Sequence, residues 1–396
     1  MTMHDLFRLM VKQNASDLLI SVGAPPSLKI DGQVLPIKAD PLTPDVARDL
    51  VFSIMTEVQH AEFELDNELN FAVTPADIGR FRINVFRQRN NVGLVARRIS
   101  SEIPSLEALG LPVATLEKIA MTKIGLVLFV GGTGTGKTTT QAAMVGYRNQ
   151  HTRGHIITIE DPIEFVHDHI KCIVDQREVG VDTESFDTAL VNAMRQAPDL
   201  IQIGEIRDSE TLRSALVFAQ TGHLCFATLH AANTYQALER IISLYPGGER
   251  DSLLMDLSMN LCAVVSQRLV PSKGGSGHVA AVEILRNLPW FRDLITKGEI
   301  DHLQEAMERP STDGVVTFDQ SLYELHQNGQ ISLEDALRNA TSKNNLRLRI
   351  QLEGTAAKDR QEIGSTLHTV EFLPRVSCFF RSEEHTSELQ SRTNFV

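Results

Sequence analysis

The sequence predicts an α/β protein in which a small α+β domain precedes a larger domain with a mainly parallel sheet. Between residues 126 and 230, short apolar runs alternate with stretches that suit helices, a pattern typical of a parallel sheet covered by helices. Before residue 100, strand signals follow one another with turn residues between them. The predicted domains are residues 1–99 and 113–350, with a linker at 100–112 and a tail at 351–396.

The first domain carries two helix signals and five strand signals. Apolar residues at helical spacing predict a helix over Asp5–Val11, and Thr43-Pro44-Asp45 predicts a helix that begins near residue 45 with Thr43 as its cap. Asp31-Gly32 is typical of a hairpin turn. The predicted strands are Asp17–Val22, Ser27–Ile30, Asn70–Thr74, Gly79–Phe86 and Gly93–Ile99.

The linker is predicted from its two prolines and one glycine, and the second domain then begins with a short helix over Leu116–Met121. After residue 280 the pattern becomes mostly helical. The predicted strands are Leu126–Val130, His155–Ile159, Leu200–Ile203 and Leu224–Thr228, and the predicted helices between them are Phe186–Gln196 and Ser209–Thr221.

Composition and charge restrict the class of protein. The chain has 396 residues and a formal net charge of −12, which argues against a broad nucleic-acid-binding surface. None of its four cysteines is spaced as C-x-x-C, so a zinc ribbon is not predicted. No basic segment leads into an apolar core at the N-terminus, and no apolar run reaches the ~20 residues that cross a bilayer. We expect a cytoplasmic protein without direct membrane insertion.

The C-terminal residues have an unusual composition. Residues 381–396 contain RSEEHTSELQS, which reads like the in-frame translation of a sequencing-library adapter. We therefore expect these residues to be an assembly artefact and exclude them from the fold. A genuine disordered polar tail is the alternative that the Ser, Thr and Glu content also allows.

The strongest chemical signal directly follows the apolar run Leu126–Val130. The sequence there reads GGTGTGKTT and matches the phosphate-loop pattern G-x-x-x-x-G-K-[ST]. Backbone N–H groups of such a loop bind phosphates, its lysine reaches the outer phosphates, and the following hydroxyl can hold Mg²⁺. The sequence thus predicts binding of ATP with Mg²⁺. The predicted nucleotide-binding residues are Gly131, Gly132, Thr133, Gly134, Thr135, Gly136, Lys137, Thr138 and Thr139.

Carboxylates follow two of the later predicted strands. Glu160, Asp161 and Glu164 end one strand, where they could position a water, or they could be an ordinary charged exit from the sheet. Glu205 ends the strand Leu200–Ile203, where an acid typically holds Mg²⁺, so Thr138 and Glu205 are the predicted metal ligands. Gln202 interrupts the apolar run of this strand, which is unexpected for a buried position.

Two histidines, His223 and His230, flank the predicted strand Leu224–Thr228. A neutral imidazole at a strand end could sense the terminal phosphate or act across a subunit boundary. A lone histidine is more often structural, and both readings remain open at this point.

The combination GGTGTGKTTT, ITIEDPIEFVH, GEIRD and TGHLCFATLHAAN resembles the type II/IV secretion ATPases, most closely their twitching-motility branch of pilus retraction motors, PilT and PilU. The resemblance covers about residues 5–350. The C-terminal segments TFDQSL, EDALRNA and NLRL are similar to the PilU branch. Where the PilT branch has a helix that retraction requires, this chain has Pro289–Lys297. An accessory motor is therefore expected.

The resemblance implies a homohexamer whose subunits each have a PAS-like N-terminal domain and a RecA-like ATPase domain. It also implies an inner-membrane platform protein and a companion PilT-type ATPase as partners, with the ring peripheral to that membrane. The implied catalytic residues are Glu164 as general base, Glu205 as the atypical Walker B acid, His223 and His230 as the His box, and Arg80, Arg82 and Arg97 as candidate sensors of the γ-phosphate.

Two other functions are consistent with parts of the sequence. An ATP-binding ring could act only as a scaffold for another retraction ATPase, although the presence of Lys137, Glu164 and Glu205 favours retained chemistry. An ATP-dependent nucleic-acid motor is the third hypothesis, since RecA-like rings also form helicases. The acidic net charge and the lack of an interleaved basic and aromatic stretch argue against it.

Overall fold

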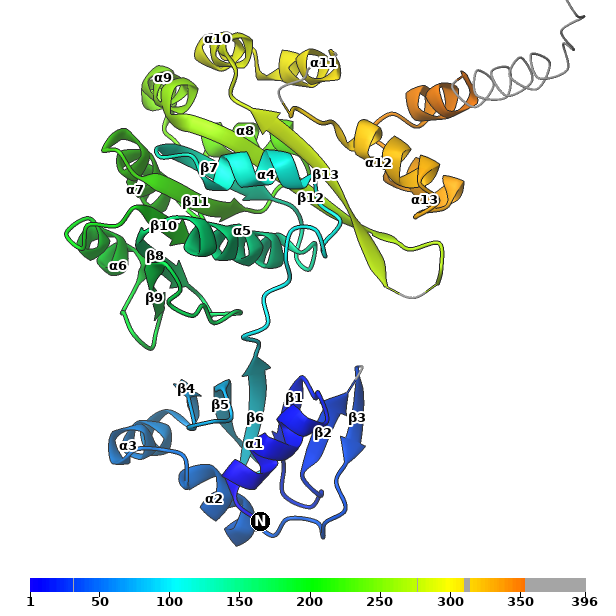
Figure 1. Cartoon of the computed structure of the whole chain (residues 1–396). Coiled ribbons are helices and arrows are strands. Elements are labelled where there is room, and N and C mark those ends of the chain that lie inside the picture. The colour runs from blue at the N-terminus through cyan, green and yellow to red at the C-terminus, as the bar shows by residue number, and fades with distance from the viewer. Residues whose placement is uncertain (31, 276, 310–313, 353–396) are drawn as a thin grey trace, which may run out of the picture. The chain divides into compact units, whose positions relative to one another are not determined.

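The computed structural model describes residues 1–30, 32–275, 277–309 and 314–352 (Figure 1). Residues 1–343 form one compact unit, and residues 344–352 are helical and belong to a second unit. The predicted adapter-derived segment, 381–396, lies outside the described residues, as does Asp31 of the predicted hairpin turn. Within the described part of the chain, no helix is both long and apolar enough to span a membrane.

The first sheet is antiparallel and has the strand order β3-β2-β1-β6-β5-β4. It contains all five strands predicted for this region and one that was not predicted, β3, whose four residues are exposed and end in a proline. Such a short edge strand leaves no alternation of apolar residues in the sequence. The strands are β1 (Asp17–Ile20), β2 (Ser27–Ile30), β3 (Gln33–Pro36), β4 (Glu68–Val73), β5 (Arg80–Gln88) and β6 (Asn91–Ile99).

Three helices accompany this sheet, namely α1 (Met3–Lys12), α2 (Pro44–Phe52) and α3 (Glu57–Asp66). As predicted, Thr43 caps α2 and its hydroxyl accepts a hydrogen bond from the Val46 N–H. Helix α3 was not predicted, because Phe63 is its only buried residue and the segment lacks an apolar stripe. Apolar residues from α1, α2 and the sheet pack into a core of their own, in which Phe7 and Phe81 stack.

The second sheet has the strand order β13-β12-β7-β11-β10-β8-β9. The prediction of a mainly parallel sheet is confirmed, since β12 and β13 form its only antiparallel pair among the described residues. The strands are β7 (Gly125–Val130), β8 (Gly154–Glu160), β9 (Cys172–Glu178), β10 (Leu200–Ile203), β11 (Leu224–Leu229), β12 (Leu261–Pro271) and β13 (His278–Arg286).

Three strands of this sheet were not predicted. Strands β12 and β13 contain buried polar residues, among them Gln267 and Glu283, which interrupt the apolar pattern. Strand β9 lies at the edge of the sheet, exposes Ile173 and contains the charged residues Asp175, Arg177 and Glu178, so its apolar pattern is weak. The mostly helical pattern predicted after residue 280 begins only after β13 ends at Arg286.

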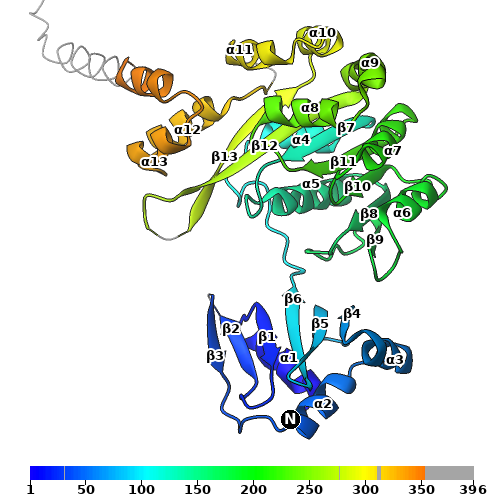
Figure 2. The same ribbon diagram turned by 180° about the vertical axis from the view of Figure 1, so that it is seen from behind.

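Helices cover both faces of the second sheet (Figures 1 and 2). Helices α4 and α5 pack on the face that carries Val127 and Phe129, and α6 to α11 pack on the face that carries Leu126 and Leu128. The helices are α4 (Val113–Ala120), α5 (Lys137–His151), α6 (Phe186–Ala193), α7 (Ser209–Gln220), α8 (Thr234–Ser243), α9 (Arg250–Asn260), α10 (Pro289–Lys297), α11 (Leu303–Glu308), α12 (Phe318–Gln327) and α13 (Leu333–Asn339), with short 3₁₀ turns at Gly247–Glu249 and Ile300–His302.

The register of the parallel strands determines where their ends lie. Val130 of β7 pairs with Leu229 of β11, Ala227 of β11 pairs with Ile203 of β10, and Ile203 pairs with Ile159 of β8. The loops that follow these four strands therefore emerge at one edge of the sheet. Ligands of open parallel sheets bind at this carboxyl edge.

A buried asparagine fixes the far end of α5 to the chain that leads into β9. Asn149 is 1% exposed. Its Nδ2 donates to the Asp168 carbonyl at 2.7 Å, and its Oδ1 accepts from the backbone N–H groups of Ile170 at 3.2 Å and Cys172 at 3.1 Å. This side chain satisfies three backbone groups that lie outside the sheet and helix ladders.

We predict that Asn149→Leu lowers the free energy of unfolding by about 2–4 kcal/mol, because it leaves buried backbone groups without partners at nearly constant volume. Urea denaturation of the full chain measures this loss. Asn192→Leu is the matched control, since Asn192 is exposed on α6 and should change stability by less than about 1 kcal/mol. Equal losses in the two variants would contradict the prediction.

Candidate active site

The phosphate loop lies between β7 and α5, where the sequence predicts it. Gly131, Gly134 and Gly136 have φ angles of 153°, 75° and 89°, in the region that favours glycine. At Gly131 a Cβ atom would also lie 2.7 Å from the backbone carbonyl oxygen of Gln267 in β12. This backbone contact favours glycine at position 131, where the loop packs against β12. Its chain then turns directly into α5, whose N-terminal N–H groups face the carboxyl edge of the sheet.

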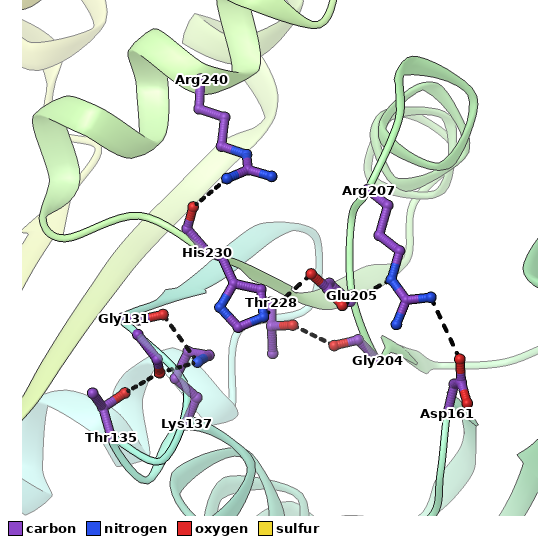
Figure 3. Close-up of polar contacts among 11 residues, drawn as sticks. Gly131, Thr135, Lys137, Asp161, Gly204, Glu205, Arg207, Thr228, His230 and Arg240 are labelled. Atoms are coloured by element: carbon purple, nitrogen blue, oxygen red, sulfur yellow. Dashed lines mark hydrogen bonds and ion pairs between the residues drawn. The ribbon is translucent and has the colours of Figure 1, made fainter.

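Lys137 is the first residue of α5 and is 8% exposed. Its Nζ donates to the carbonyl oxygens of Gly131 at 3.0 Å and Gly132 at 2.7 Å (Figure 3). Burial lowers the pKa of this ammonium group, while the nearby charges of Glu205 and Glu164 act in the opposite direction. The lysine is thus held inside its own loop by two carbonyl groups, within the field of two carboxylates.

A cavity of about 290 Å³ opens beside this lysine. It brings together residues from the phosphate loop, α5, the segment after β8, and the ends of β10 and β11. A larger cavity, of about 400 Å³, lies between the linker and the distal half of α5, and no predicted site residue lines it. The predicted site residues that line the smaller cavity are Thr133, Gly134, Lys137, Thr138, Glu164, Glu205 and His230.

Glu205 is the centre of an ionic network at the end of β10 (Figure 3). One carboxylate oxygen lies 3.2 Å from Nε2 of His230, and the other accepts from Nε of Arg207 at 2.9 Å. Arg207 also reaches Asp161 at 3.4 Å. Two charged or chargeable partners hold the carboxylate at the mouth of the cavity, and the ends of β8, β10 and β11 are thereby connected through side chains.

Hydrogen bonds from side chains to backbone carbonyls fix the segments next to His230 and Glu205. Nη1 of Arg240 in α8 donates to the His230 carbonyl at 2.9 Å, and the Thr228 hydroxyl donates to the Gly204 carbonyl (Figure 3). These contacts tie the end of β11 to α8 and to the residue before Glu205. They thus fix the backbone on both sides of the contact between the His230 imidazole and Glu205.

A buried carboxyl group, Glu160, anchors the segment that carries Glu164. The Oε1 atom of Glu160 accepts from the Thr158 hydroxyl at 2.6 Å and from Nε2 of Gln176 at 3.2 Å. Gln176 in turn donates to the Phe165 carbonyl at 2.8 Å and accepts from the His167 N–H at 2.7 Å. Residues 165–167 are therefore clamped to β9, directly after the exposed Glu164.

The surroundings of Glu160 disfavour its charged form. The residue is 5% exposed, and burial raises the pKa of its carboxyl group to about 7, against the hydrogen bonds that favour ionisation. The same carboxyl group binds Gln176, so its protonation state bears on the segment that follows Glu164.

The structure does not bring four of the predicted catalytic residues to this cavity. His223 precedes β11, at the opposite end from His230, where its Nδ1 lies 3.1 Å from the Phe218 carbonyl and 3.1 Å from the Thr221 hydroxyl. Arg97 pairs with the buried Asp17 of its own sheet at 2.8 Å. Arg82 lies opposite Arg97 in the neighbouring strand, and Arg80 lies 3.4 Å from Glu178.

The remaining predicted loop residues do not line the cavity; they are Gly131, Gly132, Thr135, Gly136 and Thr139. The Thr135 hydroxyl donates to the Gly132 carbonyl at 3.0 Å. Sequence reasoning gave no role to Arg207, although it belongs to the GEIRD motif, nor to Gln141 of α5. A charged residue two positions after a strand-end acid was the available signal for Arg207.

The side chains present fit a magnesium ion accompanied by phosphates. Thr138 offers a hydroxyl and Glu205 a carboxylate on the same cavity. Mg²⁺ is usually held by one or two carboxylates with water and phosphate oxygens, not by a complete protein cage. Accordingly, the described residues contain no cluster of three or more His, Cys, Asp or Glu side chains that could hold a metal ion alone.

Comparison with known proteins places this geometry in a family. The family model for type II/IV secretion system proteins matches residues 3–355. The type IV pilus ATPase PilU of Pseudomonas aeruginosa is 53% identical over 359 residues, which cover 91% of this chain and 94% of PilU. The pilus retraction ATPase PilT of the same organism is 40% identical over 86% of this chain and 98% of PilT.

A solved structure agrees with these sequence matches. The crystal structure of the pilus retraction motor PilT with bound ADP superposes with a TM-score of 0.81 and 40% identity, over 88% of this chain and 99% of that chain. This agreement confirms the α/β fold class. The chain is therefore a member of the type II/IV secretion system protein family, in the group that contains the type IV pilus ATPases PilU and PilT.

Proposed function

We propose that this protein is an ATP-hydrolysing motor subunit that powers retraction of type IV pili, as an accessory motor of the PilU kind. The observation that carries the proposal is the single cavity shared by Lys137, Thr138, Glu164, Glu205 and His230. The chain is more similar to PilU, at 53% identity, than to PilT, at 40% identity. The pilus specificity rests on these two relatives, and the chemistry rests on the cavity.

In the proposed reaction, water attacks the γ-phosphate of ATP and ADP leaves. Lys137 binds the outer phosphates once they replace the Gly131 and Gly132 carbonyls as its partners. Glu164 accepts a proton from the attacking water, and its position depends on the Glu160–Gln176 clamp described above. Thr138 and Glu205 would hold Mg²⁺, which would supply positive charge to neutralise the phosphates. Arg207 and His230 orient the Glu205 carboxylate.

We further propose the larger organisation in which this site works. Residues 1–99 form a PAS-like domain and residues 113–350 a RecA-like domain with C-terminal helices, joined by the linker at 100–112. Six subunits form a ring at the cytoplasmic side of the inner membrane, bound to a platform protein and to a companion PilT-type ATPase. Four proposed catalytic residues lie outside the cavity of their own subunit: Arg80, Arg82, Arg97 and His223. In such a ring they act on the γ-phosphate from these outer positions.

Lys137→Ala and Glu164→Gln should separate nucleotide binding from hydrolysis. Loss of the lysine should weaken ATP binding and abolish measurable turnover, whereas Glu164→Gln should keep ATP binding and lower kcat by about 10²–10⁴. Steady-state phosphate release and equilibrium nucleotide binding of the purified chain measure these effects. Lys171→Ala, which removes an exposed lysine outside the cavity, is the control. Hydrolysis at the wild-type rate in both variants would exclude the proposed site.

Glu160→Gln should stabilise the nucleotide-free protein at alkaline pH. Because the folded-state pKa is raised to about 7, the favourable contribution of the neutral carboxyl is complete below pH ~4.5 and is lost as the pH rises through 7. The amide cannot ionise, so its advantage over wild type should grow by about 2.5 kcal/mol between pH 5 and pH 8. Urea denaturation at both pH values measures it. The exposed Glu184→Gln is the control, and a pH-independent difference would refute this assignment.

The accessory role predicts a dependence on the companion motor. In cells that have the companion, deletion of this protein or Lys137→Ala should reduce pilus retraction, measured as twitching or as shortening of labelled pili. In cells without the companion, expression of this protein should not restore retraction. Normal pilus dynamics in the deletion and in Lys137→Ala would contradict the motor function, and retraction without the companion would contradict only the accessory role.

A further inference from the structure

Two buried glutamines on the wall of the nucleotide cavity carry polar atoms without partners. Gln141 of α5 is 1% exposed and Gln202 of β10 is 3% exposed, and both line the cavity that contains Lys137. Among the described residues, Nε2 of Gln141 and Oε1 of Gln202 have no hydrogen-bond partner. A buried amide atom without a partner is unfavourable by about 1–3 kcal/mol. One cavity thus has on its wall a donor residue and an acceptor residue whose amide atoms have no protein partner.

The strands beside Gln202 offer no donor for its oxygen. Its register neighbour on β11 is Phe226, which is apolar. Its neighbour on β8 is Thr158, whose single hydroxyl proton is donated to Glu160. The oxygen of Gln202 therefore needs a donor from the cavity, while the nitrogen of Gln141 needs an acceptor.

The chemistry of the two atoms selects the missing group. A phosphate oxygen only accepts hydrogen bonds, so it could satisfy Gln141 but would repel the oxygen of Gln202. A metal ion could bind the oxygen of Gln202 but not the N–H of Gln141. A water molecule can accept from one and donate to the other. If both amides rotate by 180°, donor and acceptor exchange sides and the pair stays complementary.

We infer that Gln141 and Gln202 bind one buried water molecule and that this bridge fixes the position of α5 relative to β10. Gln141 lies one helical turn after Lys137 and Thr138, and Gln202 lies three residues before Glu205. The bridge would thus set the spacing between the phosphate loop and the strand that carries the acid. This positioning role rests on the proposed hydrolysis, whereas the water site itself does not.

A double-mutant cycle with leucine, which has nearly the volume of glutamine, tests the bridge. Gln141→Leu or Gln202→Leu alone removes one partner of the water and should lower Tm by on the order of 5 °C. The double variant removes both partners and should recover most of the loss, because two apolar side chains replace a matched polar pair. Gln150→Leu, at an exposed position of the same helix, should leave Tm unchanged. Additive losses in the double variant would overturn the bridge.

Two further measurements are needed. The first distinguishes a bridging water from a direct bond between the two amides, and the second distinguishes a positioning role in catalysis from an effect on stability alone. A high-resolution crystal structure should show a water within hydrogen-bond distance of both amides, and a direct amide–amide bond would overturn the water site. At a temperature well below Tm, each single variant should lower kcat severalfold with little change in the KM for ATP. An unchanged kcat would refute the positioning role, and an inactive wild-type protein would refute the proposed hydrolysis while the stability cycle still tests the bridge.

Discussion

The ammonium group of Lys137 is held out of water by the carbonyl oxygens of its own loop, and the arrangement of the site follows from this constraint. A buried cation requires nearby negative charge or oxygen donors, since its transfer from water is strongly unfavourable. Gly131 and Gly132 supply the oxygens, and Glu164 and Glu205 supply the field. Phosphate groups supply oxygen acceptors and negative charge together. An anionic ligand can therefore replace the two carbonyl groups as the partner of the lysine.

The parallel register of the strands brings the groups that surround Lys137 together from distant parts of the sequence. Because β7, β11, β10 and β8 end at the same edge, residues that are far apart in the sequence meet around one lysine. Arg207 connects the acid of one strand end to Asp161 of another, and His230 reaches the same acid from a third. A positive charge placed next to Glu205, such as a bound metal ion, would weaken its attraction to Arg207 and His230. The ends of three strands would then respond together.

The sequence predicted the parts of the molecule whose signal lies in patterns along the chain. The phosphate loop and the cap at Thr43 depend on neighbouring residues, and the α/β class and the parallel sheet depend on the alternation of strand and helix patterns. The structure contains all four. Strands β9, β12 and β13 were not predicted, because charged or buried polar residues interrupt their apolar patterns. The ionic network around Glu205 could not be predicted in detail either, since its contacts depend on tertiary register. The assignments of His223 and the three arginines stay predictions, because one subunit does not bring them to the cavity.

Gln202 interrupts the apolar pattern of β10, and its position in the sheet gives this interruption a structural meaning. In the sheet it lies in register with Thr158 of β8, which itself lies in register with Gln176 of β9. Three adjacent strands thus present a row of polar side chains on the face of the sheet that α5 covers. Thr158 and Gln176 bond to Glu160, and Gln176 holds the segment after Glu164. An apolar row would pack as well, but it could not link the wall of the nucleotide cavity to the segment that carries the proposed base.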